Sequence, residues 1–234
     1  MKVTTDSCLF GAWVAHQLSK RNATGNLLDI GAGTGLLSVM VAQQNPPLQI
    51  DAIEIDAEAS KQAEENFSAS PWKERLSIIH DDVSTHQFTK TYDYVISNPP
   101  FYENELKSPN PGRKLAHHEG IAISSLLDVI RRNLSSKGRF FLLLPYKRVN
   151  EIMQLLRNAE FRIERFVSVS QSPSHSSFRI MLEGSMAGWD EQTGPGRILE
   201  PVDGEQLERI PSRRSTTRCR CNHHPRSFRA SGLS

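Results

Sequence analysis

Short runs of β-branched and other apolar residues alternate along the chain with stretches whose apolar positions recur at helical spacing. Such alternation is typical of a mostly parallel sheet with helices on both faces, so we predict an α/β fold. The segment 171–177 is too short and too polar for a helix, and the two strands that flank it are expected to form an antiparallel hairpin. The predicted strands are 26–30, 49–55, 76–80, 92–97, 139–144, 161–169 and 178–183, and the predicted helices are 9–18, 36–44, 57–70, 121–134 and 148–158.

Two segments fall outside this pattern. Residues 98–119 contain four prolines and are expected to form a loop. Loops of this length are usually functional or mobile. Beyond Gly184 the periodicity fades, and we expect residues 1–193 to form one domain and residues 194–234 a mostly disordered tail.

The positive charge of the chain is concentrated in that tail. Residues 209–234 hold seven arginines and no acidic residue, which leaves 21 basic and 26 acidic residues, a net charge of −5, for the rest of the 234-residue chain. The body of the protein therefore shows no general preference for nucleic acid, and any contact with RNA is expected to be local.

The sequence also argues against several environments and cofactors. Three cysteines do not make a disulfide scaffold, and they favour a reducing compartment, by default the cytoplasm. The longest apolar run, 140–144, is far shorter than the roughly 20 residues of a membrane-spanning helix, and no signal peptide opens the chain. Cys219, Cys221, His223 and His224 crowd into six residues, whereas zinc ligands are normally spaced around a loop. We expect no membrane partner and no bound metal, and the oligomeric state stays open.

A glycine-rich turn follows the first predicted strand. Asp29 precedes Gly31, Gly33 and Gly35, at the point where the strand leads into a helix whose first N–H groups have no partner within the helix. Glycines allow a tight turn there and let a ligand approach bare backbone. The spacing is G-x-G-x-G, with Leu36 at the place of the third glycine of the dinucleotide motif, and no Gly-Lys-Ser or Gly-Lys-Thr follows. The turn favours a nucleotide-like ligand without a pyrophosphate.

Carboxylates stand at the ends of the next two predicted strands. Glu54 ends the second strand, where an acidic side chain can accept both ribose hydroxyls of an adenosine. Asp82 follows the third strand, where it can accept the adenine amino group while Val83 packs against the ring. Each acid alone is more simply explained as a solvated loop residue. Because ligands of open α/β sheets bind at the carboxyl ends of the strands, the acids and the glycine turn together predict an adenosine site.

The fourth predicted strand ends in Asn98, Pro99, Pro100 and Phe101. The two prolines fix the backbone and remove two N–H donors, and the acceptors that remain are the Asn98 side-chain oxygen and the Pro99 carbonyl. These acceptors can take both hydrogens of a planar amino group, and Phe101 offers a face for base stacking. The alternative is that this segment simply ends the strand and opens a turn.

These motifs resemble the class I S-adenosylmethionine-dependent methyltransferases, because residues 29–35 match the first motif of that family and the terminal hairpin is a hallmark of its fold. The resemblance implies a Rossmann-like sheet of seven strands in the order 3-2-1-4-5-7-6 and S-adenosylmethionine as the cofactor. The residues that it assigns to the cofactor are Asp29, Gly31, Gly33, Gly35, Glu54, Asp82 and Val83.

Residues 98–101 resemble the fourth motif of amino-methyltransferases, which act on adenine N6, guanine N2 or a glutamine side-chain amide. Residues 1–13 and the proline-rich loop are similar to those of the bacterial valine-tRNA adenine-N6 methyltransferases that modify position 37. The similarity extends over about residues 1–183. This similarity implies a tRNA substrate and a catalytic segment of Asn98, Pro99, Pro100 and Phe101. It places Thr5 and Asp6 on the cofactor side, and Phe101, Arg113 and His118 are candidate substrate contacts.

Three alternatives remain open. Protein-glutamine methyltransferases usually carry Tyr where this chain has Phe101 and have an N-terminal helical domain, and guanine-N2 methylation of ribosomal RNA is a further possibility. Members of this tRNA methyltransferase family have an additional segment before the part that corresponds to residues 1–13. This chain starts at Met1, so part of the lid over the cofactor is expected to be missing. A noncatalytic module that binds the cofactor or RNA is therefore the third alternative.

Overall fold

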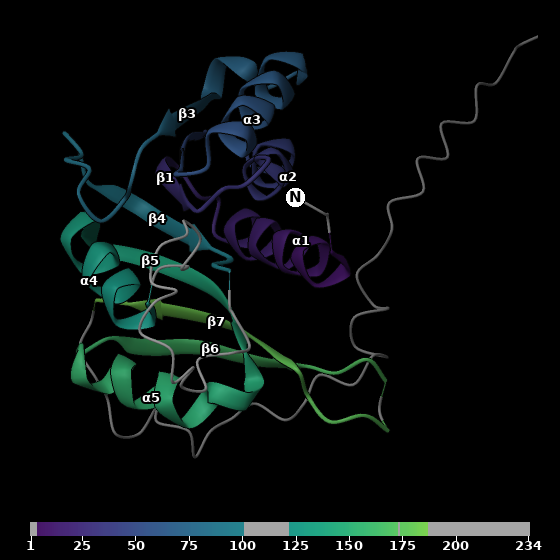
Figure 1. The fold of residues 1–234 in the computed structure, drawn as a ribbon, viewed down its shortest axis with the longest axis vertical. Helices are drawn as coiled ribbons and strands as arrows, with labels where there is room; N and C mark the ends of the chain where they lie inside the picture. Colours follow the sequence, from purple (N-terminus) through teal and green to yellow (C-terminus); the bar gives the residue numbers. More distant parts are fainter. Residues whose placement is uncertain (1–3, 101–121, 173, 187–234) are drawn as a thin grey trace, which may run out of the picture.

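The computed structural model describes residues 4–100, 122–172 and 174–186. They form one seven-stranded sheet in the order β3-β2-β1-β4-β5-β7-β6 (Figure 1), which confirms the predicted order. Strand β7 is antiparallel to β5 and β6, so the predicted terminal hairpin is also confirmed. The strands are β1 (Gly25–Ile30), β2 (Leu48–Glu54), β3 (Leu76–His80), β4 (Tyr92–Ser97), β5 (Leu134–Pro145), β6 (Arg162–Val169) and β7 (Arg179–Ser185).

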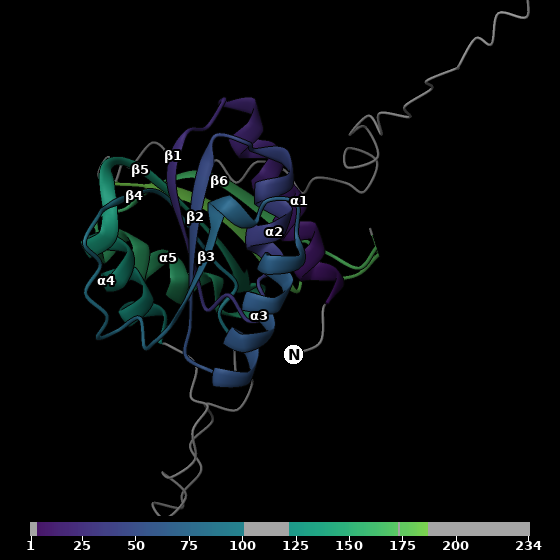
Figure 2. The same ribbon diagram turned by 90° about the horizontal axis from the view of Figure 1, so that it is seen from above.

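Helices cover both faces of this sheet (Figure 2). Helices α1, α2 and α3 pack on one face, and α4 and α5 pack on the other. None of the helices within the described ranges is long and apolar enough to cross a bilayer. The helices are α1 (Thr5–Lys20), α2 (Leu36–Gln44), α3 (Ala57–Ala69), α4 (Ile123–Asn133) and α5 (Val149–Asn158), and short 3-10 turns lie at Lys73–Arg75 and Tyr146–Arg148.

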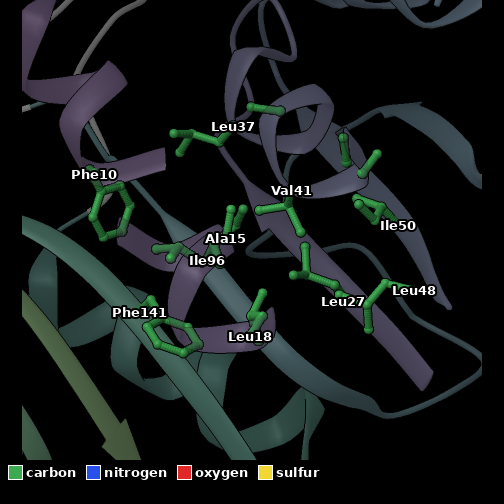
Figure 3. Close-up of a cluster of buried hydrophobic side chains, with 14 of the residues drawn as sticks. Phe10, Ala15, Leu18, Leu27, Leu37, Val41, Leu48, Ile50, Ile96 and Phe141 are labelled. Carbon is green, nitrogen blue, oxygen red and sulfur yellow. The ribbon is translucent and has the colours of Figure 1, made fainter. Parts of the chain in front are cut away.

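The core consists of two apolar clusters, one on each face of the sheet. Successive strand residues point to opposite faces, so Leu27 joins the cluster under α1 and α2, whereas Leu28 joins the cluster under α4 and α5. Figure 3 shows the first cluster, in which Phe10 of α1, Val41 of α2 and Phe141 of β5 are fully buried. Burial of aromatic and branched side chains on both faces fixes the register of the central strands.

Two element boundaries differ by more than two residues from those predicted. Helix α1 begins at Thr5 instead of residue 9, because Thr4 caps it and its side chain accepts the N–H of Ser7 at 3.4 Å. Strand β5 begins at Leu134 instead of residue 139, and its register against β4 shifts over the intervening residues. The sequence of that segment is typical of a helix end followed by a turn. Leu134 pairs with Tyr92 and Arg139 with Tyr94, so residues 135–138 bulge between these two pairs.

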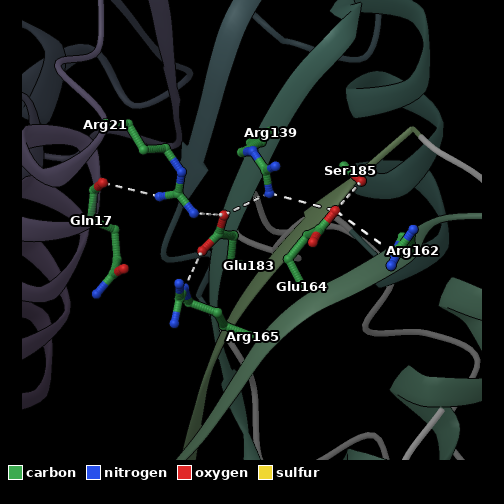
Figure 4. Close-up of polar contacts among 8 residues, drawn as sticks. All are labelled: Gln17, Arg21, Arg139, Arg162, Glu164, Arg165, Glu183 and Ser185. Atoms are coloured by element: carbon green, nitrogen blue, oxygen red, sulfur yellow. Dashed lines mark hydrogen bonds and ion pairs between the residues drawn. The ribbon is translucent and has the colours of Figure 1, made fainter. Parts of the chain in front are cut away.

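A polar cluster braces the antiparallel end of the sheet (Figure 4). The side chain of Glu183 on β7 is fully buried and accepts hydrogen bonds from Arg21 at 2.6 Å and Arg139 at 3.0 Å. Its other oxygen lies 3.1 Å from Arg165 on β6. Because Arg21 follows the end of α1, one carboxylate joins that helix to three strands, and the charge of the carboxylate is offset by partly exposed guanidinium groups.

Candidate active site

The carboxyl ends of β1, β2, β3 and β4 lie along one edge of the sheet. The Ser97 hydroxyl donates to the carbonyl of Ile30 at 2.8 Å, which joins the ends of β4 and β1. The N–H of Asp81 donates to the carbonyl of Glu54 at 3.2 Å, which joins the ends of β3 and β2. The polar residues predicted at separate strand ends are therefore brought together.

The glycine turn leaves open space next to its backbone. Gly31 and Gly35 have φ angles of 67° and 80°, in the left-handed region that a side chain disfavours. A Cβ added at Gly35 would collide with Phe67 of α3, whereas a Cβ at Gly31 would meet no atom of the described residues within 4 Å. Gly35 is thus required for packing, and Gly31 borders room for a ligand.

Asp29 lies beneath this turn as a fully buried carboxyl group. Its Oδ2 accepts a hydrogen bond of 2.7 Å from Ser38 on α2, while its Oδ1 has no hydrogen-bond partner among the described residues. Burial raises the pKa of Asp29 to about 7, although the hydrogen bonds from Ser38 oppose the shift. Asp29 therefore brings to the site a buried oxygen that no described residue satisfies.

Glu54 holds the glycine turn against the end of β2. Its Oε2 accepts the N–H of Gly33 at 2.7 Å and its Oε1 accepts the N–H of Asp56 at 2.9 Å, and the residue is 7% exposed. Each carboxylate oxygen has a second lone pair, so both can still accept a hydroxyl hydrogen. The next residue, Ile55, is a large apolar residue that is 65% exposed.

Asp82 lies in a tight turn after β3. Its Oδ1 accepts the N–H of Ser84 at 2.8 Å, and its own N–H donates to Asp81 at 2.8 Å. The hydrogen bond from His86 to Asp81 lowers the pKa of that neighbouring carboxyl group. Val83 is half-buried and packs against the cluster under α4 and α5, so part of its surface remains at the edge of the site.

Asn98 follows β4 directly and is half-buried. Its side-chain nitrogen donates a hydrogen bond of 2.8 Å to the hydroxyl of Ser7 in the first turn of α1. Pro99 is buried and Pro100 is exposed. Because the donor end of the Asn98 amide is held by Ser7, the acceptor end is the one left for a ligand.

The first turn of α1 is itself tied to the sheet. Asp6 accepts a hydrogen bond of 2.9 Å from Arg179 of β7, and Thr5 is exposed. Burial acts to raise the pKa of Asp6, but the hydrogen bonds from Thr4 and Arg179 and the charge of Arg179 outweigh it, so the pKa is lowered. In this structure Asp6 acts as an ionised tether that holds the helix end over the site.

Three predicted site residues, Phe101, Arg113 and His118, lie outside the described residues, as do the tail and its Cys219–His224 group. Within the described ranges no group of three or more His, Cys, Asp or Glu side chains is placed to hold a metal ion. Sequence reasoning missed Ser7 and Ile55. An apolar residue directly after the acid of β2 was a usable signal for Ile55, whereas nothing local distinguishes Ser7.

The chemistry of this edge fits S-adenosylmethionine. The space beside Gly31 admits a ligand to bare backbone, Glu54 and Asp82 offer acceptors to hydroxyl and amino groups, and Ile55 offers an apolar surface for a base. Together with the strand order, these features define a class I S-adenosylmethionine-dependent methyltransferase.

Comparison with known sequences identifies the family within this class. The family model "Methyltransferase small domain" matches residues 11–142. The tRNA1(Val) (adenine(37)-N6)-methyltransferase of Dyadobacter fermentans is 38% identical over 86% of this chain and 80% of that protein. The enzymes of the same name from Aliivibrio salmonicida and Tolumonas auensis are 35% and 40% identical, over 80% and 70% of this chain and 78% and 68% of theirs. The chain belongs to the methyltransferase small domain family and, within it, to the family of these tRNA1(Val) (adenine(37)-N6)-methyltransferases.

Solved structures agree on the fold. The glycopeptide N-methyltransferase MtfA complexed with S-adenosyl-L-methionine has a TM-score of 0.56 and 15% identity, over 76% of this chain and 88% of that chain. An S-adenosylmethionine-dependent methyltransferase from Clostridium acetobutylicum has a TM-score of 0.56 and 13% identity, over 76% and 91%. At this level of identity the likeness shows the fold alone.

Proposed function

We propose that this protein transfers a methyl group from S-adenosylmethionine to the N6 amino group of an adenine in tRNA, with position 37 of a valine tRNA as the target. The observation that carries the proposal is the placement of Asn98 and Pro99 directly after β4, beside the glycine turn, with the donor end of the Asn98 amide already bound to Ser7. The names of the relatives, 35–40% identical over most of the chain, support the choice of adenine N6 and tRNA.

The cofactor is assigned to the edge that contains the glycine turn. Asp29, Gly31, Gly33 and Gly35 form its floor, and Thr5 and Asp6 lie on the side of α1. Glu54 accepts the ribose hydroxyls, and Asp82, Val83 and Ile55 surround the adenine. Bound there, S-adenosylmethionine supplies a methyl group on a positively charged sulfur.

The side chains around the amino group contribute alignment and polarisation. The N6 nitrogen of adenine is a weak nucleophile because its lone pair is conjugated with the ring. The side-chain oxygen of Asn98 and the carbonyl of Pro99 accept its two hydrogens and hold the nitrogen in one orientation. As the nitrogen gains positive charge its hydrogens become stronger donors, so these two hydrogen bonds tighten in the transition state. Pro99 and Pro100 lack N–H groups, so neither backbone nitrogen competes as a donor.

The RNA contacts are assigned to residues outside the described ranges. Phe101 stacks on the target base after the base has left its helical stack, and Arg113 and His118 contact the RNA near it. We place this activity in the cytoplasm, where tRNA is available.

The substrate is tested by nucleoside mass spectrometry of tRNA from cells with and without the gene. We expect N6-methyladenosine to disappear from one tRNA when the gene is deleted and to return with the wild-type gene. Incubation of the purified protein with labelled cofactor and separated RNA pools supplies the second readout. Label in guanine of ribosomal RNA, or in protein, would contradict the assignment.

The role of Asn98 is tested by the Asn98→Ala variant. We expect kcat to fall roughly 100-fold, the scale of losing one hydrogen bond that acts in the transition state, while cofactor affinity measured by calorimetry stays within twofold. Asn133→Ala is the matched control, since Asn133 is also half-buried but lies at the far end of α4. Full activity of Asn98→Ala would refute the amino-orienting role.

A further inference from the structure

The contact between Ser7 and Asn98 joins two residues that are 91 positions apart. An asparagine amide has an acceptor end and a donor end of nearly the same shape, so packing alone does not decide which end faces a ligand. The proposed reaction needs the acceptor end toward the substrate amine. The donor end is the one that reaches Ser7 Oγ, at 2.8 Å. From this geometry we infer that Ser7 is a positioning residue for methyl transfer, a role that rests on the proposed function of Asn98.

The Ser7 hydroxyl can accept from Asn98 while its own hydrogen goes to Thr4. Ser7 Oγ lies 2.8 Å from Thr4 Oγ1, and Thr4 Oγ1 also accepts the N–H of Ser7 at 3.4 Å. When the Ser7 hydroxyl donates to Thr4, its lone pairs face Asn98. The hydrogen bonds then run in one direction, from Asn98 to Ser7 to Thr4, and a flipped amide would place oxygen against oxygen.

The helix turn that carries Ser7 is fixed relative to the sheet. Asp6 accepts a hydrogen bond from Arg179 of β7 at 2.9 Å, and its other oxygen accepts the N–H of Ser7 at 3.1 Å. Farther along α1, a Cβ on Gly11 would collide with Met40, so this glycine permits a close approach to α2. Ser7 therefore meets Asn98 from a rigid element, and the first turn of α1 becomes part of the substrate site.

The first test compares Ser7→Ala with Ser7→Thr. We expect Ser7→Ala to lower kcat roughly three- to tenfold, the factor that one net hydrogen bond is worth, with the KM values for cofactor and tRNA and the melting temperature unchanged. Ser7→Thr keeps the hydroxyl and is expected to restore kcat to within twofold. Ser19→Ala, an exposed serine near the other end of α1, is the matched control. A kcat for Ser7→Ala equal to that of Ser19→Ala would overturn the inference.

A double-variant cycle separates positioning from a general structural role. In Asn98→Asp both ends of the side chain are oxygens, so its orientation no longer matters. We expect adding Ser7→Ala to Asn98→Asp to change kcat less than twofold, while the same change in the wild-type background costs three- to tenfold. Equal losses in both backgrounds would refute positioning through Asn98. Full activity of Asn98→Ala would contradict the proposed function of Asn98. An inactive Asn98→Ala together with a fully active Ser7→Ala would contradict only the positioning role of Ser7.

Discussion

Replacing Asp29 by Asn is expected to change how the stability of the protein depends on pH. Asp29 is fully buried with an unsatisfied Oδ1, and burial raises its pKa from 3.8 to about 7. Between these values the folded protein keeps a proton that the unfolded chain has released, so the free energy of unfolding falls as pH rises through this window. At about 1.4 kcal/mol per pKa unit, ionised Asp29 costs the fold about 4 kcal/mol above pH 7, and about 3 kcal/mol of that cost appears between pH 5 and pH 8.

Asparagine resembles the neutral acid in shape and stays neutral, so the variant escapes this cost. We expect the unfolding free energy of Asp29→Asn, relative to wild type, to rise by about 3 kcal/mol from pH 5 to pH 8. Urea unfolding without cofactor, followed by circular dichroism at several pH values, measures the difference. Asp128→Asn makes the same replacement on the exposed face of α4 and should run parallel to wild type. Parallel curves for Asp29→Asn and wild type would show that Asp29 does not titrate in this window.

Two further predictions follow from the glycine turn and the Glu183 cluster. Gly31→Ala puts a methyl group into the open space of the site at a φ angle of 67°, so we expect cofactor affinity to fall at least about tenfold by calorimetry, with only about 1 kcal/mol of stability lost. Gly35→Ala meets Phe67 and should instead lose more stability in urea; equal stability losses for the two variants would contradict this division. Glu183→Gln removes the charge that faces three guanidinium groups. It should lower the free energy of unfolding by about 2–4 kcal/mol, and the loss should lie at the low end of this range because those arginines are partly exposed. Added salt should recover part of that loss, and a variant within about 0.5 kcal/mol of wild type would count against the cluster as a stabilising element.

The order of elements and the strand order were predictable because each depends on neighbouring residues. Short runs of apolar residues marked β1, β2 and β4, and apolar positions at helical spacing marked the helices. The glycine turn was equally visible, since its positive φ angles at Gly31 and Gly35 require glycine whatever surrounds them. Boundaries were less predictable: β5 begins at Leu134 because Leu134 already pairs with Tyr92 of β4, ahead of a bulge that the local sequence indicates as a turn.

Individual side chains show the same difference between what neighbouring residues reveal and what depends on distant contacts. That Glu54 and Asp82 stand at strand ends could be read from the order of residues. Glu54 also accepts the N–H of Gly33 and so holds the glycine turn in place. This contact could not be read from the sequence, because the two residues are 21 positions apart. Asp6 was expected beside the cofactor, and the structure gives its carboxylate to Arg179, 173 residues away.

By itself, the sequence determined the α/β fold, the position of the glycine turn and the Asn-Pro-Pro segment, because backbone torsions and hydrophobic periodicity act over a few residues. Only the tertiary structure decided which donors meet which acceptors at the edge of the sheet. Crossover connections place β4 beside β1 and bring the start of α1 to Asn98, and these distances depend on how whole layers pack. The orientation of one amide at the centre of the site is therefore a property of the assembled fold.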